Sequence, residues 1–295
     1  MRVGLFLIDE KSLFQKQQEA AARSAAVANG VELDAFFAAG DVTKQRDQMF
    51  GYLRSGLEPA AIVVEPAEDA GLRFVGQEAV RKGCGFVILN RTPSWTSEVG
   101  SGTSAPVFCV TADQTEIGRI QSDQFQALLP SGGTVLYVTG PGLSDTSQAR
   151  LAGMKERQGS GLSAILIDGA WTEASGHDAV RRWLDTTRGF VPFDLIGAQN
   201  DDMAVGAKRA AADGALLFEK PEWESVPVTG VDGVPEYGRR LVDERVLVAT
   251  VVMPTTTGEA VELVVGALKG GRHPAAVTTV PVTSYPDLGG LRARR

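Results

Sequence analysis

The sequence has few of the residues that build metal centres and covalent cross-links. Of its 295 residues, only two are cysteine and two are histidine. Cys84 and Cys109 can form at most one disulfide, which a chain of this length does not need for its stability. His177 and His273 are far apart, and no Cys-x-x-Cys or His-x-x-x-His spacing occurs. Because zinc and iron sites depend on such spacings, we predict no metal and no other cofactor.

Long apolar runs and an excess of basic charge are also missing. The longest apolar runs, VGLFLI and LVATVVM, are well short of the roughly 18 residues that a membrane span requires. The 29 lysines and arginines stand against 36 aspartates and glutamates, which gives a formal net charge of −7. A surface that binds phosphates needs the opposite balance. We therefore predict no membrane insertion and no direct nucleic-acid partner.

Length and periodicity predict an α/β protein with two lobes. A chain of 295 residues, 43% of them hydrophobic, suits two domains of roughly 100–150 residues each. Apolar runs alternate with helical stretches, and most runs are apolar throughout, as in parallel sheets covered on both faces. The expected strands are 2–8, 31–37, 60–65, 85–89, 106–110, 134–139, 163–168, 193–198, 226–231, 247–252 and 277–283. The expected helices are 12–29, 41–56, 69–82, 114–129, 145–159, 173–187, 201–214, 233–244 and 256–270.

Three breaks in this alternation indicate where the chain crosses between the lobes. They lie at 111–113, 253–255 and 281–286. We expect two doubly wound parallel-sheet lobes joined by a three-strand hinge. The predicted lobes are 1–112 plus 253–283, and 113–252 plus 284–295. Discontinuous lobes of this kind suit hinge closure on a ligand held between them.

Two of the expected helices begin with capping signals. Ser12 is followed by Gln15, and Asp113 is followed by Glu116. Each pair places a hydrogen-bond acceptor at the helix start and a longer polar side chain three residues later.

Polar and aromatic residues gather directly after the predicted strands. Ligands of open α/β sheets bind beyond the carboxyl ends of the strands. Sugars and polyols present many hydroxyls and one apolar face, so they need paired donors and acceptors together with flat aromatic surfaces. Arginine, asparagine and aspartate can supply the hydrogen bonds, and Phe14, Trp95 and Trp171 can supply the surfaces. The pattern favours a sugar or polyol as the ligand.

Seven segments carry a resemblance to a known family. They are KSLFQKQQEAA, ILNRTP, QARLAGM, GAWTEASG, GAQNDDMAVGA, VTGVDGVPEYG and ATVVMPTTTGEAVEL. Together they resemble the type I periplasmic sugar-binding proteins, the ribose- and galactose-binding group, whose lobes are shared with the effector domains of the lactose-repressor family. By this resemblance the ligand-binding residues are Lys11, Leu13, Phe14, Asn90, Arg91, Arg150, Trp171, Asn200, Asp232 and Met253. Departures from the family pattern at Lys11, Asn90 and Met253 leave the identity of the sugar open.

Structural interpretations of the candidate residues compete with binding. Arg91 and Arg150 could be surface ion-pair partners, as most arginines are. Trp183 lies on a helix among charged residues and is expected to pack. Asp201 and Asp202 are interpreted first as helix N-terminal caps, which the helix dipole favours, and only second as ligands. Asn200 is therefore the better binding candidate.

Motifs of enzymes are weak or missing. Gly140-Pro141-Gly142 begins like a dinucleotide fingerprint, but Asp145 would place a negative charge at the third glycine position. No GxxxxGK[ST] occurs. Adjacent carboxylates such as Asp201 and Asp202 point about 100° apart on a helix and cannot flank one bond. We predict that the protein is not an enzyme.

Two functions remain, and both use the same fold. The first is a substrate-binding component that delivers a small sugar or polyol to an ABC transporter permease or a membrane sensor, in the periplasm or cell envelope by the resemblance. The alternative is a cytoplasmic effector-binding regulator of the lactose-repressor type without its DNA-binding domain. Met1 leads directly into the first strand, so neither a leader nor a helix-turn-helix is visible. If Met1 is the native start, a cytoplasmic location is expected.

Overall fold

The computed structural model describes residues 1–68, 71–142, 144–271 and 274–293, so His273 lies outside the described residues. The chain divides into two compact units and passes from one to the other three times. Unit 1 comprises Met1–Ala112 and Pro254–Val280, and unit 2 comprises Asp113–Met253 and Pro281–Arg295.

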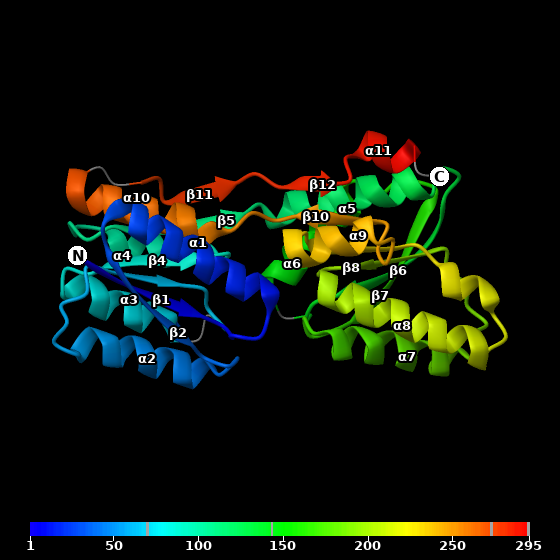
Figure 1. The fold of residues 1–295 in the computed structure, drawn as a ribbon, viewed down its shortest axis with the longest axis horizontal. Coiled ribbons are helices and arrows are strands. Elements are labelled where there is room, and N and C mark those ends of the chain that lie inside the picture. The colour runs from blue at the N-terminus through cyan, green and yellow to red at the C-terminus, as the bar shows by residue number, and fades with distance from the viewer. Residues whose placement is uncertain (69–70, 143, 272–273, 294–295) are drawn as a thin grey trace. The chain divides into compact units, whose positions relative to one another are not determined.

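Unit 1 is built on a six-stranded parallel sheet in the order β11-β5-β4-β3-β1-β2. Its strands are β1 (Arg2–Leu7), β2 (Glu32–Phe37), β3 (Ala61–Val64), β4 (Gly85–Leu89), β5 (Val107–Ala112) and β11 (Val277–Val280). Helices α1 (Leu13–Asn29) and α10 (Thr256–Gly270) lie side by side on one face (Figure 1). Helices α2 (Val42–Arg54) and α3 (Leu72–Arg81) cover the other face, with the short α4 (Thr96–Gly100) beside α3. Both faces are covered, which explains why β3 and β4 are buried at every position.

Unit 2 repeats this plan with one antiparallel edge strand, in the order β12-β10-β9-β8-β6-β7. Its strands are β6 (Gly133–Thr139), β7 (Leu162–Asp168), β8 (Leu195–Ala198), β9 (Val228–Asp232), β10 (Ala249–Val252) and β12 (Thr283–Tyr285). Its longer helices are α5 (Gln114–Leu128), α6 (Asp145–Glu156), α7 (Glu173–Thr187) and α8 (Asp201–Leu217), and its short ones are η1 (Pro221–Ser225), η2 (Pro235–Arg239), α9 (Arg240–Asp243) and α11 (Leu288–Ala293). No described helix combines the length and the apolar character that crossing a bilayer requires.

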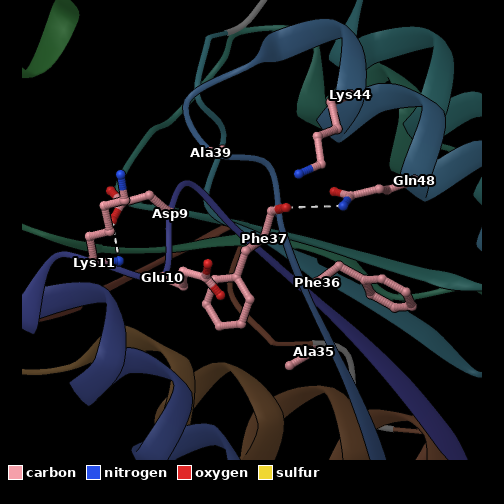
Figure 2. Close-up of a pocket in the computed structure, with 9 residues that line it drawn as sticks. All are labelled: Asp9, Glu10, Lys11, Ala35, Phe36, Phe37, Ala39, Lys44 and Gln48. Atoms are coloured by element: carbon pink, nitrogen blue, oxygen red, sulfur yellow. Dashed lines mark hydrogen bonds between the residues drawn. The ribbon is translucent and has the colours of Figure 1, made fainter.

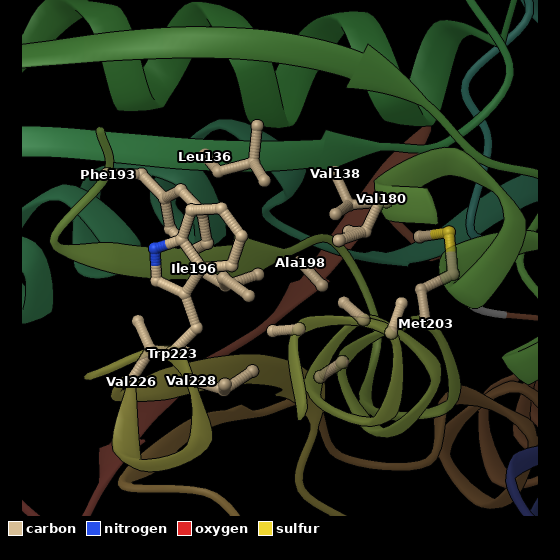
Figure 3. Close-up of a cluster of buried hydrophobic side chains, with 14 of the residues drawn as sticks. Leu136, Val138, Val180, Phe193, Ile196, Ala198, Met203, Trp223, Val226 and Val228 are labelled. Carbon is tan, nitrogen blue, oxygen red and sulfur yellow. The ribbon is translucent and has the colours of Figure 1, made fainter. Parts of the chain in front are cut away.

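A large hydrophobic core of unit 2 lies between its sheet and the pair α7 and α8 (Figure 3). Side chains of β6 and β8 meet small residues of α8 there, and Trp223 closes one end. The Phe193 and Trp223 rings stack with centroids 5.3 Å apart, while the Trp183 ring meets Phe193 edge-on at 5.6 Å. The prediction that Trp183 packs is confirmed.

The predicted fold class is confirmed, and every predicted strand has a counterpart in the structure. The expected strand 277–283 is in fact two strands, because Pro281 interrupts it. β11 completes the parallel sheet of unit 1, and β12 pairs antiparallel with β10 of unit 2. The short elements α4, η1 and α11 were not predicted.

The predicted lobe boundaries differ from the observed units at two of the three crossings. Met253 belongs to unit 2, where its sulfur lies 3.7 Å from an Arg150 nitrogen and 3.9 Å from the Gln114 amide nitrogen. Residues 281–283 also belong to unit 2, because Thr283 pairs with Val252.

One of the two capping predictions is wrong. Asp113 accepts a hydrogen bond from the Glu116 backbone N–H as expected. Ser12 makes no capping bond. Its own N–H donates to Asp9 Oδ1 at 2.7 Å, and the Gln15 side chain turns inward to the end of the sheet.

Candidate functional site

The candidate residues of unit 1 follow the carboxyl ends of β1 and β4. Lys11 and Leu13 are exposed and Phe14 is half-buried, whereas Asn90 is buried. Strand β3 lies between β1 and β4 in the sheet. The two groups therefore stand at the ends of strands that are not neighbours, and the residue that follows β3 separates them.

That residue is Glu65, a buried carboxylate that the sequence analysis missed. Its Oε2 accepts a hydrogen bond from Gln15 Nε2 at 2.9 Å, and its Oε1 accepts one from Asn90 Nδ2 at 3.0 Å. Burial raises the pKa of Glu65, and the hydrogen bonds from Asn90 and Gln15 oppose that rise. A lone acidic residue directly after the apolar strand 61–64 was the available signal.

Asn90 has an unusual backbone and an unpaired oxygen. Its φ of 55° lies in the left-handed region, which asparagine tolerates better than most residues. Its Oδ1 is buried and has no hydrogen-bond partner among the described residues. The next residue, Arg91, donates from Nη2 to the Ala67 carbonyl at 3.2 Å. Buried polar atoms are nearly always paired, so the Asn90 oxygen is a candidate contact for a ligand.

In unit 2, the structure brings Arg150, Trp171 and Met253 together. Arg150 Nε donates to Gln114 Oε1 at 2.9 Å, and its Nη1 donates to the Gln199 carbonyl. The guanidinium carbon lies 5.6 Å from the centroid of the Trp171 ring, and Nη2 contacts the Met253 sulfur. Arg150 is only 3% exposed, so the interpretation as a surface ion-pair partner is wrong.

Close contact between α5 and α6 fixes the position of Arg150. A methyl group on Gly118 would lie 1.9 Å from the Arg150 carbonyl oxygen, and one on Gly153 would lie 1.9 Å from the Thr115 carbonyl oxygen. Only glycine permits this approach of the two backbones. The helix that carries Arg150 is therefore held directly against the helix that carries Gln114.

The electrostatic environment of Arg150 combines burial with acidic neighbours. Burial lowers the pKa of Arg150, while the negative charges of Asp232 and Asp201 raise it. Arginine remains charged under such opposing effects because its ordinary pKa is so high. The cluster therefore holds a cation next to an aromatic face.

Trp171 and Asn200 follow β7 and β8 of the same sheet, and Asp232 is the last residue of β9. Asn200 caps α8 by accepting from the Met203 N–H at 3.0 Å, and its Nδ2 donates to the Trp171 carbonyl at 2.9 Å. Trp171 has a φ of 65° and Asp232 a φ of 108°. Non-glycine residues in this region are strained, and such strain concentrates at functional sites. The structure therefore places Trp171 and Asp232 in constrained conformations at the carboxyl edge of the sheet.

Asp201 is a second buried carboxylate, which corrects its interpretation as a helix cap. Its Oδ1 accepts from the Thr250 hydroxyl at 2.7 Å, and its Oδ2 accepts from the Gly233 N–H at 2.9 Å. A methyl group on Gly230 or Gly238 would collide with its carboxylate. Burial raises the pKa of Asp201 to about 7, aided by the charge of Asp202 and opposed by the two hydrogen bonds.

The raised pKa of Asp201 predicts a pH-dependent stability. Because the folded state favours the neutral form, folding takes up a proton between the ordinary pKa of 3.8 and about 7. This contribution is fully present below the unfolded pKa and is lost as the pH rises through the folded pKa. Asp201→Asn imitates the neutral form, so the thermal midpoint of this variant should rise relative to that of the wild type between about pH 4 and pH 7. Equal slopes for the two proteins would contradict the prediction.

Unit 1 also holds a cavity of about 370 Å³ beside the first candidate group (Figure 2). Lys11, Phe37 and Lys44 line it, and Gln48 Nε2 donates to the Phe37 carbonyl at 3.0 Å at its edge. Unit 2 has a cavity of about 530 Å³ next to Leu128 and Leu291, which is not at the carboxyl edge of its sheet. Of the two, only the first touches a predicted site residue.

The remaining aromatic and sulfur residues have structural positions. Trp95, which the sequence offered as an aromatic surface, packs on the core of unit 1. Cys84 and Cys109 are buried free thiols. Burial raises the pKa of Cys84 to about 12 and also raises that of Cys109, so both stay protonated. Within the described ranges, no three His, Cys, Asp or Glu side chains form a group that could hold a metal ion.

Known proteins resemble this chain over most of its length. Residues 3–272 match the family model described as "Periplasmic binding protein domain". The D-galactose/methyl-galactoside binding periplasmic protein of Haemophilus influenzae is 29% identical over 223 residues, which is 70% of this chain and 62% of that protein. The xylitol-binding protein of Mycolicibacterium smegmatis is 24% identical over 248 residues, which is 80% of this chain and 62% of that protein. The chain thus spans less than two thirds of the length of these two relatives.

A solved structure agrees with the fold over nearly all residues. It is a periplasmic solute-binding protein of an ABC transporter from Actinobacillus succinogenes with bound D-allose, with a TM-score of 0.84 at 17% identity and coverage of 99% of both chains. The two doubly wound sheets define a periplasmic binding protein fold of type I. The chain belongs to the periplasmic binding protein domain family.

Proposed function

We propose that this protein binds a small carbohydrate or polyol with residues from both units. The single observation that carries the proposal is the pair formed by the buried Arg150 and the half-buried Trp171, in which a charged donor group lies over an aromatic face. A polyol needs both a donor to its hydroxyls and a flat surface for its C–H face. The galactoside- and xylitol-binding relatives support this class of ligand.

Each unit contributes a different kind of contact in this proposal. Unit 1 offers the Asn90 oxygen as an acceptor and Arg91 and Phe14 as neighbours. Unit 2 offers Arg150 as a donor, Trp171 as an aromatic face, and Asn200 and Asp232 as further polar groups. Lys11, Leu13 and Met253 complete the proposed set. Because the chain passes between the units three times, we propose that the ligand binds by hinge closure, in a state that uses both sets.

The proposed biological role is the substrate-binding component of a sugar ABC transporter or of a membrane sensor. We place it in the periplasm or cell envelope, and we propose that it binds without catalysis. Both relatives reported above are binding proteins, which supports this role over a cytoplasmic regulator of the lactose-repressor type. Cell fractionation separates the two, since the proposal expects the protein outside the cytoplasmic membrane.

A thermal-shift screen tests the proposed ligand class. The probes are D-galactose, D-allose, L-arabinose, myo-inositol and xylitol, with glycine and citrate as non-polyol controls. A ligand at 100 times its dissociation constant stabilises the folded state by roughly 2.7 kcal/mol. At least one pentose, hexose or polyol should therefore raise the thermal midpoint by several degrees. A response to neither these probes nor a wider polyol panel would contradict the proposal.

A further inference from the structure

We infer that Glu65 is a positioning residue that fixes the direction of the Asn90 side-chain amide, so that Asn90 presents a hydrogen-bond acceptor to the ligand. The inference rests on the proposed function for the meaning of that acceptor. The geometry itself is independent of any ligand. It consists of a row of hydrogen bonds along the ends of three neighbouring strands, β1, β3 and β4.

The direction of the row is set at its first member. The backbone N–H of Ile8 can only donate, and it donates to Gln15 Oε1 at 3.1 Å. The amide of Gln15 must therefore turn its Nε2 the other way, toward Glu65 Oε2 at 2.9 Å. An ionised carboxylate can only accept. In the structure, the second oxygen of Glu65 faces the nitrogen of Asn90 and accepts from it at 3.0 Å, which is the direction that an ionised carboxylate requires.

Glu65 is itself held in place by its backbone. Gln45 Nε2 donates to the Glu65 carbonyl at 2.8 Å, and Gln45 Oε1 accepts from the Ala67 N–H at 2.9 Å. A backbone carbonyl can only accept a hydrogen bond and a backbone N–H can only donate one, so these two contacts allow the Gln45 amide a single orientation. The backbone at Glu65 and Ala67 is thereby fixed, which anchors the residue that carries the carboxylate.

The consequence for the ligand is a requirement for a hydrogen donor. One Nδ2 hydrogen of Asn90 is committed to Glu65, which turns Oδ1 away from the carboxylate, and that oxygen is buried and unpaired among the described residues. A hydroxyl or amine hydrogen of a ligand satisfies it. An ether oxygen, a carbonyl oxygen or a fluorine at the same place has no hydrogen to donate. Its lone pairs would repel those of Asn90 Oδ1, and that oxygen would stay unpaired.

Replacing Glu65 with glutamine should reverse the direction of the Asn90 amide. The new side chain has one oxygen and one NH₂ group, and Gln15 Nε2 still requires the oxygen. The NH₂ group must then face Asn90, which rotates to accept with Oδ1 and turns Nδ2 outward. The variant changes shape very little, but it converts the acceptor of Asn90 into a donor.

Nuclear magnetic resonance on the ligand-free protein tests the direction without any ligand. In the wild type, we expect slow exchange of the Asn90 side-chain amide proton bound to Glu65, and a scalar coupling from Nδ2 to the Glu65 carboxylate carbon. In Glu65→Gln, we expect amide exchange at Asn90 to become at least tenfold faster while that of Gln15 stays slow. Glu98→Gln, an exposed glutamate paired with Arg73 on the surface of unit 1, is the matched control and should leave both unchanged.

Two results would overturn the inference. One is the absence of the Nδ2 to Glu65 coupling in the wild type, which decides the matter even if Glu65→Gln fails to fold. The other is unchanged exchange at Asn90 in a folded Glu65→Gln protein. Because neither result depends on a ligand, failure here is distinct from a failure of the sugar screen.

A ligand arm then tests the consequence for specificity. The probes are D-galactose or myo-inositol, whichever binds in the screen, and its monodeoxyfluoro derivatives. At one position, fluorine should weaken binding to the wild type at least tenfold, and Glu65→Gln should reduce this penalty at that same position. A penalty that is identical in the two proteins at every position would contradict an acceptor at Asn90.

Discussion

Arg150→Met is expected to weaken ligand binding by about tenfold to a hundredfold. The guanidinium carries more N–H donors than its contacts to Gln114, Gln199 and Met253 use. A charge-assisted hydrogen bond from the remaining donors to a ligand hydroxyl contributes roughly 1.5–3 kcal/mol. Methionine keeps most of the buried volume, so calorimetric titration of the folded variant with the ligand from the screen isolates the lost donors.

Arg119→Met is the matched control for this experiment. Arg119 lies on α5, the helix packed against α6, and its ion pairs to Glu116 and Glu156 are partly exposed. Exposed ion pairs contribute little to stability, so the control should bind as the wild type does. An Arg150→Met protein that is folded and binds with unchanged affinity would remove Arg150 from the site.

Trp171→Ala is expected to lower affinity by about tenfold through loss of the aromatic face. The ring is held by its contact with Arg150 and by the backbone of Gly140, where a methyl group would lie 2.1 Å from a ring atom. Aromatic contacts of this kind contribute roughly 0.5–1.5 kcal/mol beyond the area they bury. Trp171→Phe keeps a flat face and should recover part of the affinity in the same titration.

Trp183→Ala is the comparison variant, and we expect it to change stability instead of affinity. Its ring packs on Phe193 in the core of unit 2, so its loss should lower the thermal midpoint and leave the affinity of the folded protein intact. If Trp171→Ala behaved in the same way, Trp171 would be a packing residue and not a binding one.

The order of strands and helices could be predicted from the sequence because parallel strands that are buried on both faces consist of continuous apolar runs. β4 and β6 are examples in which nearly every position is covered by helices on both sides. The prediction of strands was wrong where the local apolar pattern continues but tertiary contacts divide the segment between two sheets. Residues 277–283 look like one strand, but they serve two different sheets on either side of Pro281.

Site residues could be predicted from the sequence where they directly follow strands. They could not be predicted where a side chain turns into the interior to meet a residue far along the chain. Arg150 and Asn90 were named from the family resemblance, and the structure adds their burial and partners. Glu65 was missed because a single glutamate after a strand is normally exposed. Gln15 was assigned to a helix cap because its backbone position suits one, whereas its side chain reaches Glu65, fifty positions along the chain.

The most direct test of the central claim is a calorimetric titration with the ligand from the screen, comparing one variant from each unit. Asn90→Ala removes the acceptor of unit 1, and Asp232→Asn removes a charge of unit 2. The account predicts one ligand per chain and an affinity loss of at least tenfold in each variant, because both units contact the same ligand in the closed state. Unchanged affinity in either folded variant, or a stoichiometry of two, would contradict a single ligand bound by residues of both units.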